Sequence, residues 1–144
     1  RLPEKERDYI SLSRSGTDKH SQLMMRLNDN DPDPYVIAKT GSAEQTLEAF
    51  TYWKTEHPEF PVVNQQYING SGYQALAAGR LKEAENLLRA QVSLFPDSAN
   101  AYDSLADYFM AAQQWEQAKD AVEKALERDP AHPEAQAKLS KLSQ

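Results

Sequence analysis

The fold is decided by residues 96–130, which read PDSANAYDSLADYFMAAQQWEQAKDAVEKALERDP and can be laid over the residues before them. A shift of 34 positions places Pro130 on Pro96 and Ala118 on Ala84. Small residues recur in this overlay where two helix backbones would come close, and large apolar residues fill the space between them. A repeat of this length is typical of solenoids built from pairs of antiparallel helices. The sequence therefore predicts an all-α fold.

The same stretch resembles the tetratricopeptide repeat, whose unit is a helix–turn–helix. The positions that fit the helix A and helix B pattern of that family are Tyr102, Leu105, Ala106, Phe109, Ala118, Val122, Ala125 and Pro130. The preceding copy keeps Gly72, Ala84, Leu88 and Pro96. It departs from the pattern at Ser71, Ala75 and Gln91, which predicts either looser packing or an atypical neighbour. The resemblance implies a helical solenoid that ends in a C-terminal capping helix.

The spacing of the prolines predicts the organisation of the chain. We expect an N-terminal segment (1–34), then a repeat domain (35–144) made of a degenerate repeat (35–62), two full repeats (63–96 and 97–130) and a capping helix (131–144). The first repeat is degenerate because Pro58 and Pro96 lie 38 positions apart rather than 34.

Local residue types predict where helices start and how the stack closes. Ser42 and Ser98 can cap the helices that follow them, and Gly79 stands where a left-handed helix ending is needed. Phe50 and Trp53 fall in helix B packing positions and seal the N-terminal end of the stack. At the other end we expect a polar-faced helix that covers the core, with Leu139 and Leu142 turned inward.

The N-terminal segment leaves several interpretations open. Leu23, Met24 and Leu27 are spaced for one face of a short helix. This helix either lies on the open edge of the solenoid, fills the groove, or joins a second copy in a homodimer. Residues 28–34 are rich in oxygen-bearing side chains, but a calcium-binding EF-hand loop counted from Asp29 would need Gly where Pro34 stands and Glu where Thr40 stands, which favours a linker or a capped turn. Because the chain begins at Arg1, we expect a trimmed or processed form.

Composition excludes several classes of function. Hydrophobic residues make up 40% of the chain and charged residues 26%. These proportions suit a soluble globular protein. A net charge of −6 argues against a nucleic-acid partner. The absence of cysteine excludes disulfides, thiolate metal sites and a cysteine nucleophile.

The same overview bears on membranes, cofactors and compartment. No apolar run is long enough to insert into a membrane. We expect no metal and no cofactor, and both the cytoplasm and the periplasm remain open as compartments.

A catalytic site is not predicted. His57 and His132 lie beside prolines at helix corners, where we expect them to be solvated. The segment around Ser71 is not a nucleophile elbow, because that motif needs glycine where Asn69 and Tyr73 stand. No zinc-protease, P-loop or dinucleotide-binding motif occurs. We therefore predict that the chain is not an enzyme.

The resemblance implies a concave groove lined by the inner helices. The groove-facing residues would be Gln66, Asn69, Tyr73 and Leu76 in one repeat, and Asn100, Asp103, Asp107 and Met110 in the next. None is cationic, whereas family members that hold a chaperone's C-terminal carboxylate use Lys, Arg and Asn at such places. Amides, an aromatic ring and two carboxylates favour an extended peptide, or one carrying Lys or Arg. The alternative is a merely solvated polar face. We predict a non-catalytic scaffold that binds a protein or peptide.

A narrower resemblance covers residues 43–59 and 69–106. These stretches are similar to the tetratricopeptide tails of secreted or periplasmic bacterial serine hydrolases, esterase-like or β-lactamase-like. The string from Pro96 to Leu105, PDSANAYDSL, is the most specific part. This resemblance implies an accessory C-terminal domain whose partner is a hydrolase domain upstream, with a periplasmic or secreted location. The segment 1–30 matches no part of the hydrolases.

Overall fold

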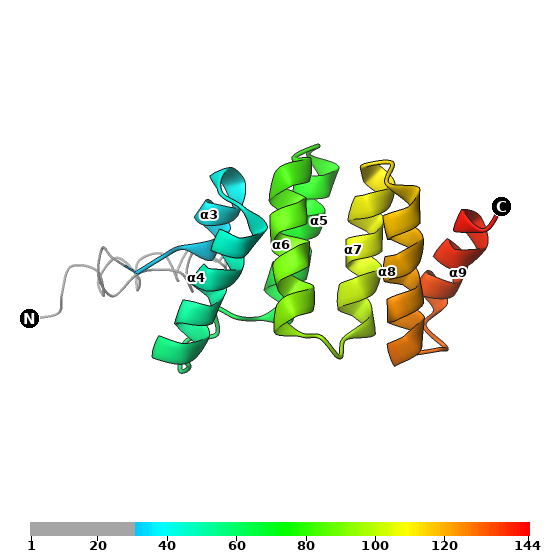
Figure 1. The fold of residues 1–144 in the computed structure, drawn as a ribbon. Helices are drawn as coiled ribbons and strands as arrows, with labels where there is room; N and C mark the ends of the chain where they lie inside the picture. Colours follow the sequence, from blue (N-terminus) through cyan, green and yellow to red (C-terminus); the bar gives the residue numbers. More distant parts are fainter. Residues whose placement is uncertain (1–30) are drawn as a thin grey trace, which may run out of the picture.

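The computed structural model describes residues 31–144, which contain helices and no strand. The helices are α3 (Pro34–Thr40), α4 (Ala43–Glu56), α5 (Gln65–Ala77), α6 (Leu81–Leu94), α7 (Ala99–Ala111), α8 (Trp115–Arg128) and α9 (Pro133–Leu142). They form one stack with α3 and α4 at one end and α9 at the other, in which α3 and α4 lie against α6, α6 packs with α5 and α7, and α8 lies between α7 and α9 (Figure 1). The predicted all-α solenoid is confirmed. The predictions for Leu23, Met24 and Leu27 lie outside the described residues.

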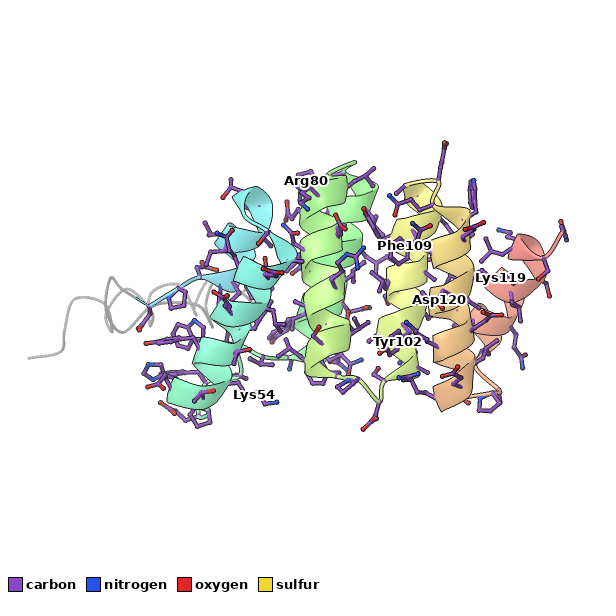
Figure 2. All side chains as sticks on the ribbon, in the orientation of Figure 1. Lys54, Arg80, Tyr102, Phe109, Lys119 and Asp120 are labelled. Atoms are coloured by element: carbon purple, nitrogen blue, oxygen red, sulfur yellow. The ribbon has the colours of Figure 1, made fainter. Side chains whose placement is uncertain are left out.

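The second helices of the three pairs, α4, α6 and α8, have the same length and end at equivalent positions. Helices α4, α6 and α8 are each 14 residues long, and they end at His57, Phe95 and Asp129 as C-caps. Each cap stands immediately before one of the prolines that mark the repeats, so caps and prolines share the same spacing. Because consecutive helices are antiparallel, Arg80 before α6 and Tyr102 near the start of α7 lie toward opposite edges of the stack (Figure 2).

The first helices of the pairs share a second register. Helices α5 and α7 are each 13 residues long and begin after the N-caps Asn64 and Ser98. Helix α9 begins after His132, which lies one repeat length beyond Ser98. Side-chain oxygens of Asn64 and Ser98 accept hydrogen bonds from the first backbone N–H groups, as a capping residue should. By this register α9 begins at the position equivalent to the starts of α5 and α7.

Small residues let the helices approach as the sequence predicted. Ala84, Ala106 and Ala118 are fully buried in the C-terminal part of the core. A Cβ atom at Gly72 would lie 2.6 Å from Cδ2 of Leu88. Only glycine therefore fits between these helices without displacing that side chain. The repeat in the sequence thus reflects close backbone contact between helices.

Aromatic residues close the N-terminal end of the described stack. Phe50 and Trp53 are buried with Ile68 and Leu87, which confirms their predicted packing role. The ring of Tyr35 meets Phe50 edge-on, with the ring centroids 5.3 Å apart. Edge-to-face pairs of this kind add to the gain from burial. The degenerate pair α3–α4 is thus an integral part of the core.

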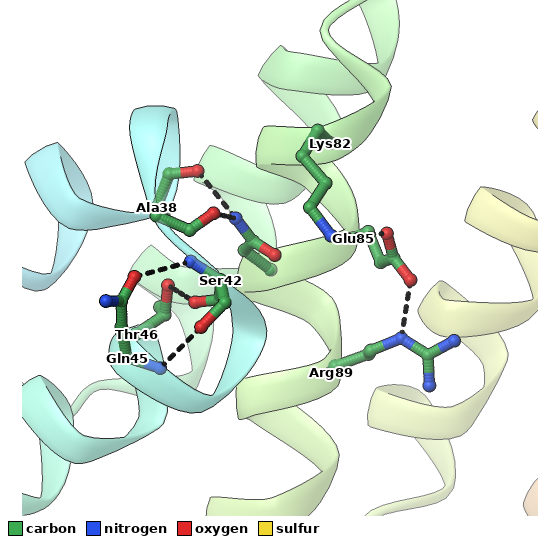
Figure 3. A network of polar contacts seen from close by, with 9 residues as sticks. Ala38, Ser42, Gln45, Thr46, Lys82, Glu85 and Arg89 are labelled. Atoms are coloured by element: carbon green, nitrogen blue, oxygen red, sulfur yellow. Dashed lines mark hydrogen bonds and ion pairs between the residues drawn. The ribbon is translucent and has the colours of Figure 1, made fainter.

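A polar network fastens α3 and α4 to α6. Ser42 and Gln45 form a reciprocal capping box at the start of α4 (Figure 3). Nδ2 of Asn86 on α6 donates hydrogen bonds to the backbone oxygens of Ala38 at 2.9 Å and Gly41 at 3.0 Å. These two carbonyls lie at the end of α3, where the helix leaves acceptors unpaired.

The turn before α3 is a helix cap. Oδ1 of Asp33 accepts hydrogen bonds from the backbone N–H groups of Tyr35 and Val36. Asp31 is buried and accepts a hydrogen bond from the hydroxyl of Tyr52 at 2.5 Å. These carboxylates therefore have structural roles within residues 31–34. In the part of the chain that the structure describes, no helix could span a membrane.

Candidate functional site

Helices α5 and α7 pack against each other and carry the eight residues predicted to face the groove. A hollow of about 400 Å³ gathers five of these eight: Gln66, Asn69, Tyr73, Asn100 and Asp103. A sixth, Asp107, contacts Tyr73 directly. Leu76 and Met110 do not line this hollow; they are half-buried against the C-terminal part of the core. The groove lining is therefore more polar than the sequence predicted.

The hollow also contains residues that the prediction missed. They are Gln65, Gln91, Ser98, Ser104, His132 and Glu134. The repeat could have identified two of them, because His132 and Glu134 lie one repeat length after Ser98 and Asn100. Gln91 was marked in the sequence only as a departure from the family pattern. The hollow is thus lined by α5, α6, α7 and the start of α9.

Hydrogen bonds along the groove join α5 to the start of α7, and α7 to the start of α9. Nε2 of Gln65 donates to Oγ of Ser98 at 2.5 Å. The ring of His132 contacts Oδ1 of Asn100 at 2.6 Å. Each bond ties the cap of one first helix to the preceding first helix. The groove wall is therefore fixed from α5 to α9 by groups of the chain itself.

The prediction that His132 is solvated is wrong. Only 6% of this residue is exposed, because it caps α9 from beneath. Its Nδ1 accepts a hydrogen bond from the backbone N–H of Ala135, so in the neutral ring the proton lies on Nε2 and is donated to Asn100. His57 is also half-buried, with its ring centroid 5.1 Å from that of Trp53. Both histidines therefore have packing roles.

A lysine from α9 forms ion pairs with both carboxylates predicted to face the groove. Nζ of Lys138 lies 2.8 Å from Asp103 and 3.2 Å from Asp107. The carboxylates that we expected to attract a cationic peptide thus already face a cation of the chain. No cation stands at the eight predicted positions, but the fold brings this one from α9, two helices further along the chain. A cationic ligand would therefore have to compete with Lys138.

Tyr73 is held in its neutral form. Burial raises the pKa of its hydroxyl, and the hydrogen bond that it donates to Asp107 raises the pKa further. A neutral phenol remains a hydrogen-bond donor at ordinary pH. Its ring is half-buried and faces the hollow. Tyr73 therefore offers a fixed aromatic surface rather than a reactive group.

Several polar groups of the hollow are already engaged within the chain. Both ring nitrogens of His132 are engaged, so it is not free to serve as a general base for Ser98 or Ser104. Ser98 caps α7, and Ser71 lies in the middle of α5. In residues 31–144 no three His, Asp or Glu side chains gather as a metal site would require. The lining of the hollow is rich in hydrogen-bonding side chains.

A second hollow of about 510 Å³ lies between α3 and α4. Its lining includes Gln45, which is already committed to the capping box. Within the described residues, the buried polar atoms that lack a hydrogen-bond partner belong to Asn69, Asn86 and Gln91. Two of these residues line the groove hollow and none lines the hollow at α3. The groove is therefore the better candidate site, although its hollow is smaller.

Comparison with known proteins supports the repeat assignment. Residues 75–142 match the family model of the tetratricopeptide repeat, a helical repeat typical of protein-interaction scaffolds. A point mutant of MamA superposes with a TM-score of 0.56 and 16% identity, over 76% of this chain and 77% of that one. MamA 41-end from Desulfovibrio magneticus RS-1 gives 0.54 and 20%, over 99% and 86%. The MamA RS-1 ArsTM double mutant gives 0.54 and 22%, over 99% and 85%. These likenesses concern the fold, and no curated protein matches significantly.

Proposed function

We propose that this chain is a non-catalytic scaffold that binds an extended peptide or partner segment in the groove formed by α5, α7 and α9. The observation that carries the proposal is the polar hollow of about 400 Å³, to which each of these three helices contributes side chains. In a solenoid, successive inner helices present side chains at a regular spacing. An extended chain can therefore contact several helices at once.

The groove chemistry favours a polar segment over a strongly charged one. Glu134 on its wall disfavours an acidic ligand. Lys138 occupies the position that a ligand cation would take beside Asp103. Amides of Gln66 and Asn69 can pair with backbone or side-chain amides, and Tyr73 supplies an aromatic contact of low conformational entropy.

The proposal predicts that groove variants lose peptide binding. A random dodecapeptide library displayed on phage is selected on the domain, and the enriched peptides are titrated by fluorescence anisotropy. Replacing both Gln66 and Asn69 by alanine should weaken binding by about tenfold, because each hydrogen bond contributes about 0.5–1.5 kcal/mol. The matched control is Gln74→Ala, an exposed glutamine on α5 outside the hollow. A library that yields no binder, or binders indifferent to the double variant, contradicts the proposal.

A second proposal is that the chain is the accessory domain of a larger serine hydrolase. It is favoured by the string from Pro96 to Leu105, which forms the α6–α7 turn and the first half of α7. The reading frame encoded before Arg1 tests it: a GxSxG or SxxK motif there supports a catalytic partner in the same chain. A reading frame without either motif contradicts this second proposal and favours a stand-alone scaffold. The periplasmic or secreted location belongs to this second proposal only.

A further inference from the structure

The position four residues before the C-cap of α4, α6 and α8 holds three different residue types. Trp53, Gln91 and Ala125 each accept, through the backbone oxygen, the hydrogen bond of the C-cap residue of α4, α6 and α8. They are therefore equivalent in the repeat. Nε1 of Trp53 donates to the backbone oxygen of Pro32 at 2.5 Å, and Ala125 has no polar side-chain atom. Gln91 alone brings a polar side chain into this slot without a partner for it.

Gln91 is fully buried, and neither Oε1 nor Nε2 has a hydrogen-bond partner. Burying an unsatisfied amide is costly, and such groups in a folded protein call for an explanation. Gln91 lines the floor of the groove hollow, where Asn69 also has a buried Oδ1 without a partner. The two side chains come from α6 and α5, and they leave two acceptors and one amide donor unsatisfied in a single hollow.

This set of groups is complementary to a carboxamide. The NH₂ of a ligand carboxamide can donate to Oε1 of Gln91 and Oδ1 of Asn69, while its oxygen accepts from Nε2 of Gln91. A carboxylate has no proton for the two acceptors, and an ammonium group has no acceptor for the donor. Glu134 on the wall of the hollow further disfavours an anion.

We propose that Gln91 and Asn69 form a subsite that receives the side-chain carboxamide of an asparagine or glutamine from the partner segment. This inference rests on the proposed function and adds to it a specificity for one chemical class of side chain. A peptide backbone group presents only one N–H and satisfies fewer of the free atoms. The primary amide of a side chain is therefore the better match.

The proposal makes stability and binding respond in opposite directions to one substitution. Gln91→Leu keeps the size of the side chain and removes the two unsatisfied polar atoms. The free protein should then melt at a higher temperature, while a carboxamide ligand should bind about tenfold more weakly. If Gln91 were there for structure alone, this variant would melt at a lower temperature. The matched control Gln74→Leu changes an exposed glutamine outside the hollow and should not affect ligand binding.

Three small probes separate the ligand classes. Acetamide, N-methylacetamide and acetate represent the side-chain amide, the backbone amide and the carboxylate, and each is titrated into the isotope-labelled full chain. Acetamide should shift the side-chain NH₂ signals of Gln91 and Asn69 more than N-methylacetamide does, and acetate should not shift them. Gln91→Leu should abolish the shift at Asn69. Equal shifts with N-methylacetamide would mean that the subsite binds a backbone amide of the ligand as well as it binds a side-chain amide. No shift with acetamide would mean that buried water, not a ligand, satisfies the amide of Gln91. Either result overturns the proposal.

A selection experiment distinguishes this inference from the proposed function. The dodecapeptide library is selected in parallel on the natural chain and on Gln91→Leu. Enrichment of Asn or Gln at one peptide position on the natural chain, lost on the variant, supports the subsite. If peptides bind without that enrichment, the carboxamide subsite is contradicted, while the proposed scaffold function is still supported. A library without binders defeats both.

Discussion

The turn between the two helices of a repeat requires a backbone conformation that side chains disfavour. Gly79 ends α5 with φ of +78°, and Gln113 ends α7 with φ of +60°. After each, the backbone N–H of Arg80 or Gln114 donates to the carbonyl five residues earlier at 2.8 Å. This is the left-handed helix ending that favours glycine. The residue at this turn is therefore less favourable in the repeat 97–130, which has Gln113, than in the repeat 63–96, which has Gly79.

Replacing Gln113 by glycine should stabilise the protein by about 1 kcal/mol, because glycine adopts the left-handed conformation without the steric penalty of a Cβ atom. The reciprocal substitution, Gly79→Ala, should destabilise the protein by a similar amount. Both residues are exposed, so packing changes little. Urea unfolding followed by circular dichroism measures the two differences. A Gln113→Gly variant less stable than the natural chain would contradict this account of the turn.

At the scale of the element, α9 packs against α8 and is joined to α7 by an ion pair. Leu139 and Leu142 of α9 are turned toward the core, as the sequence predicted. Lys138 and Asp103 are both largely buried, with 14% and 9% of their side chains exposed. A buried carboxylate that loses its cation is left uncompensated. The ion pair therefore makes the docking of α9 sensitive to a single side chain.

Lys138→Met should destabilise the protein by about 3 kcal/mol, the lower end of the cost of removing one partner from a buried ion pair. The lower end applies because Asp107, the second carboxylate beside Lys138, is partly exposed. Asp103→Asn added to this variant should restore much of the loss, since the buried carboxylate is then gone. Thermal melts of the single and the double variant measure the coupling between the two residues. Additive losses would mean that the contact contributes nothing to stability.

For the whole molecule, each end of the stack is covered by groups of a different kind. Trp53 and Phe50 lie under α3 at one end, where Asn86 binds the carbonyls that end α3. The polar-faced α9 covers the other end. A solenoid needs such caps because each repeat buries its apolar face only against its neighbours.

Removing residues 1–30 should leave the domain folded and monomeric, with peptide binding at least as strong as before. Two competing explanations fail if this holds: that the N-terminal segment fills the groove, and that Leu23, Met24 and Leu27 join two copies. The measurements are the helical melt, the mass by light scattering and the affinity for selected peptides.

A longer deletion, of residues 1–41, serves as the control. It also removes α3 and exposes Phe50, so it should destabilise the domain strongly. Aggregation or a lost melt after the shorter deletion would mean that the N-terminal segment serves internal packing.

The repeat in the sequence was sufficient to predict the helices and their pairing. It located Gly72, Ala84 and Ala118 at close helix contacts, while residue type placed Ser42 and Ser98 at helix starts. These features are local or recur in register, because each repeat meets its neighbour in the same way. Six of the eight proposed groove positions lie in the hollow or touch a residue in it, for the same reason. Leu76 and Met110 could not be placed, because an apolar side chain at a groove edge turns inward whenever the core leaves room for it.

Only the tertiary structure decided which groups satisfy one another across helices. Lys138 on α9 reaches Asp103 on α7, and His132 is buried at the start of α9 although it lies beside a proline. Gln91 occupies a slot that holds tryptophan in one repeat and alanine in another, and nothing in the described part of the chain pairs with its amide. Periodicity fixes which backbones meet, since it records their spacing. The partner of a polar atom depends on small differences in distance between helices, and that spacing pattern does not contain them.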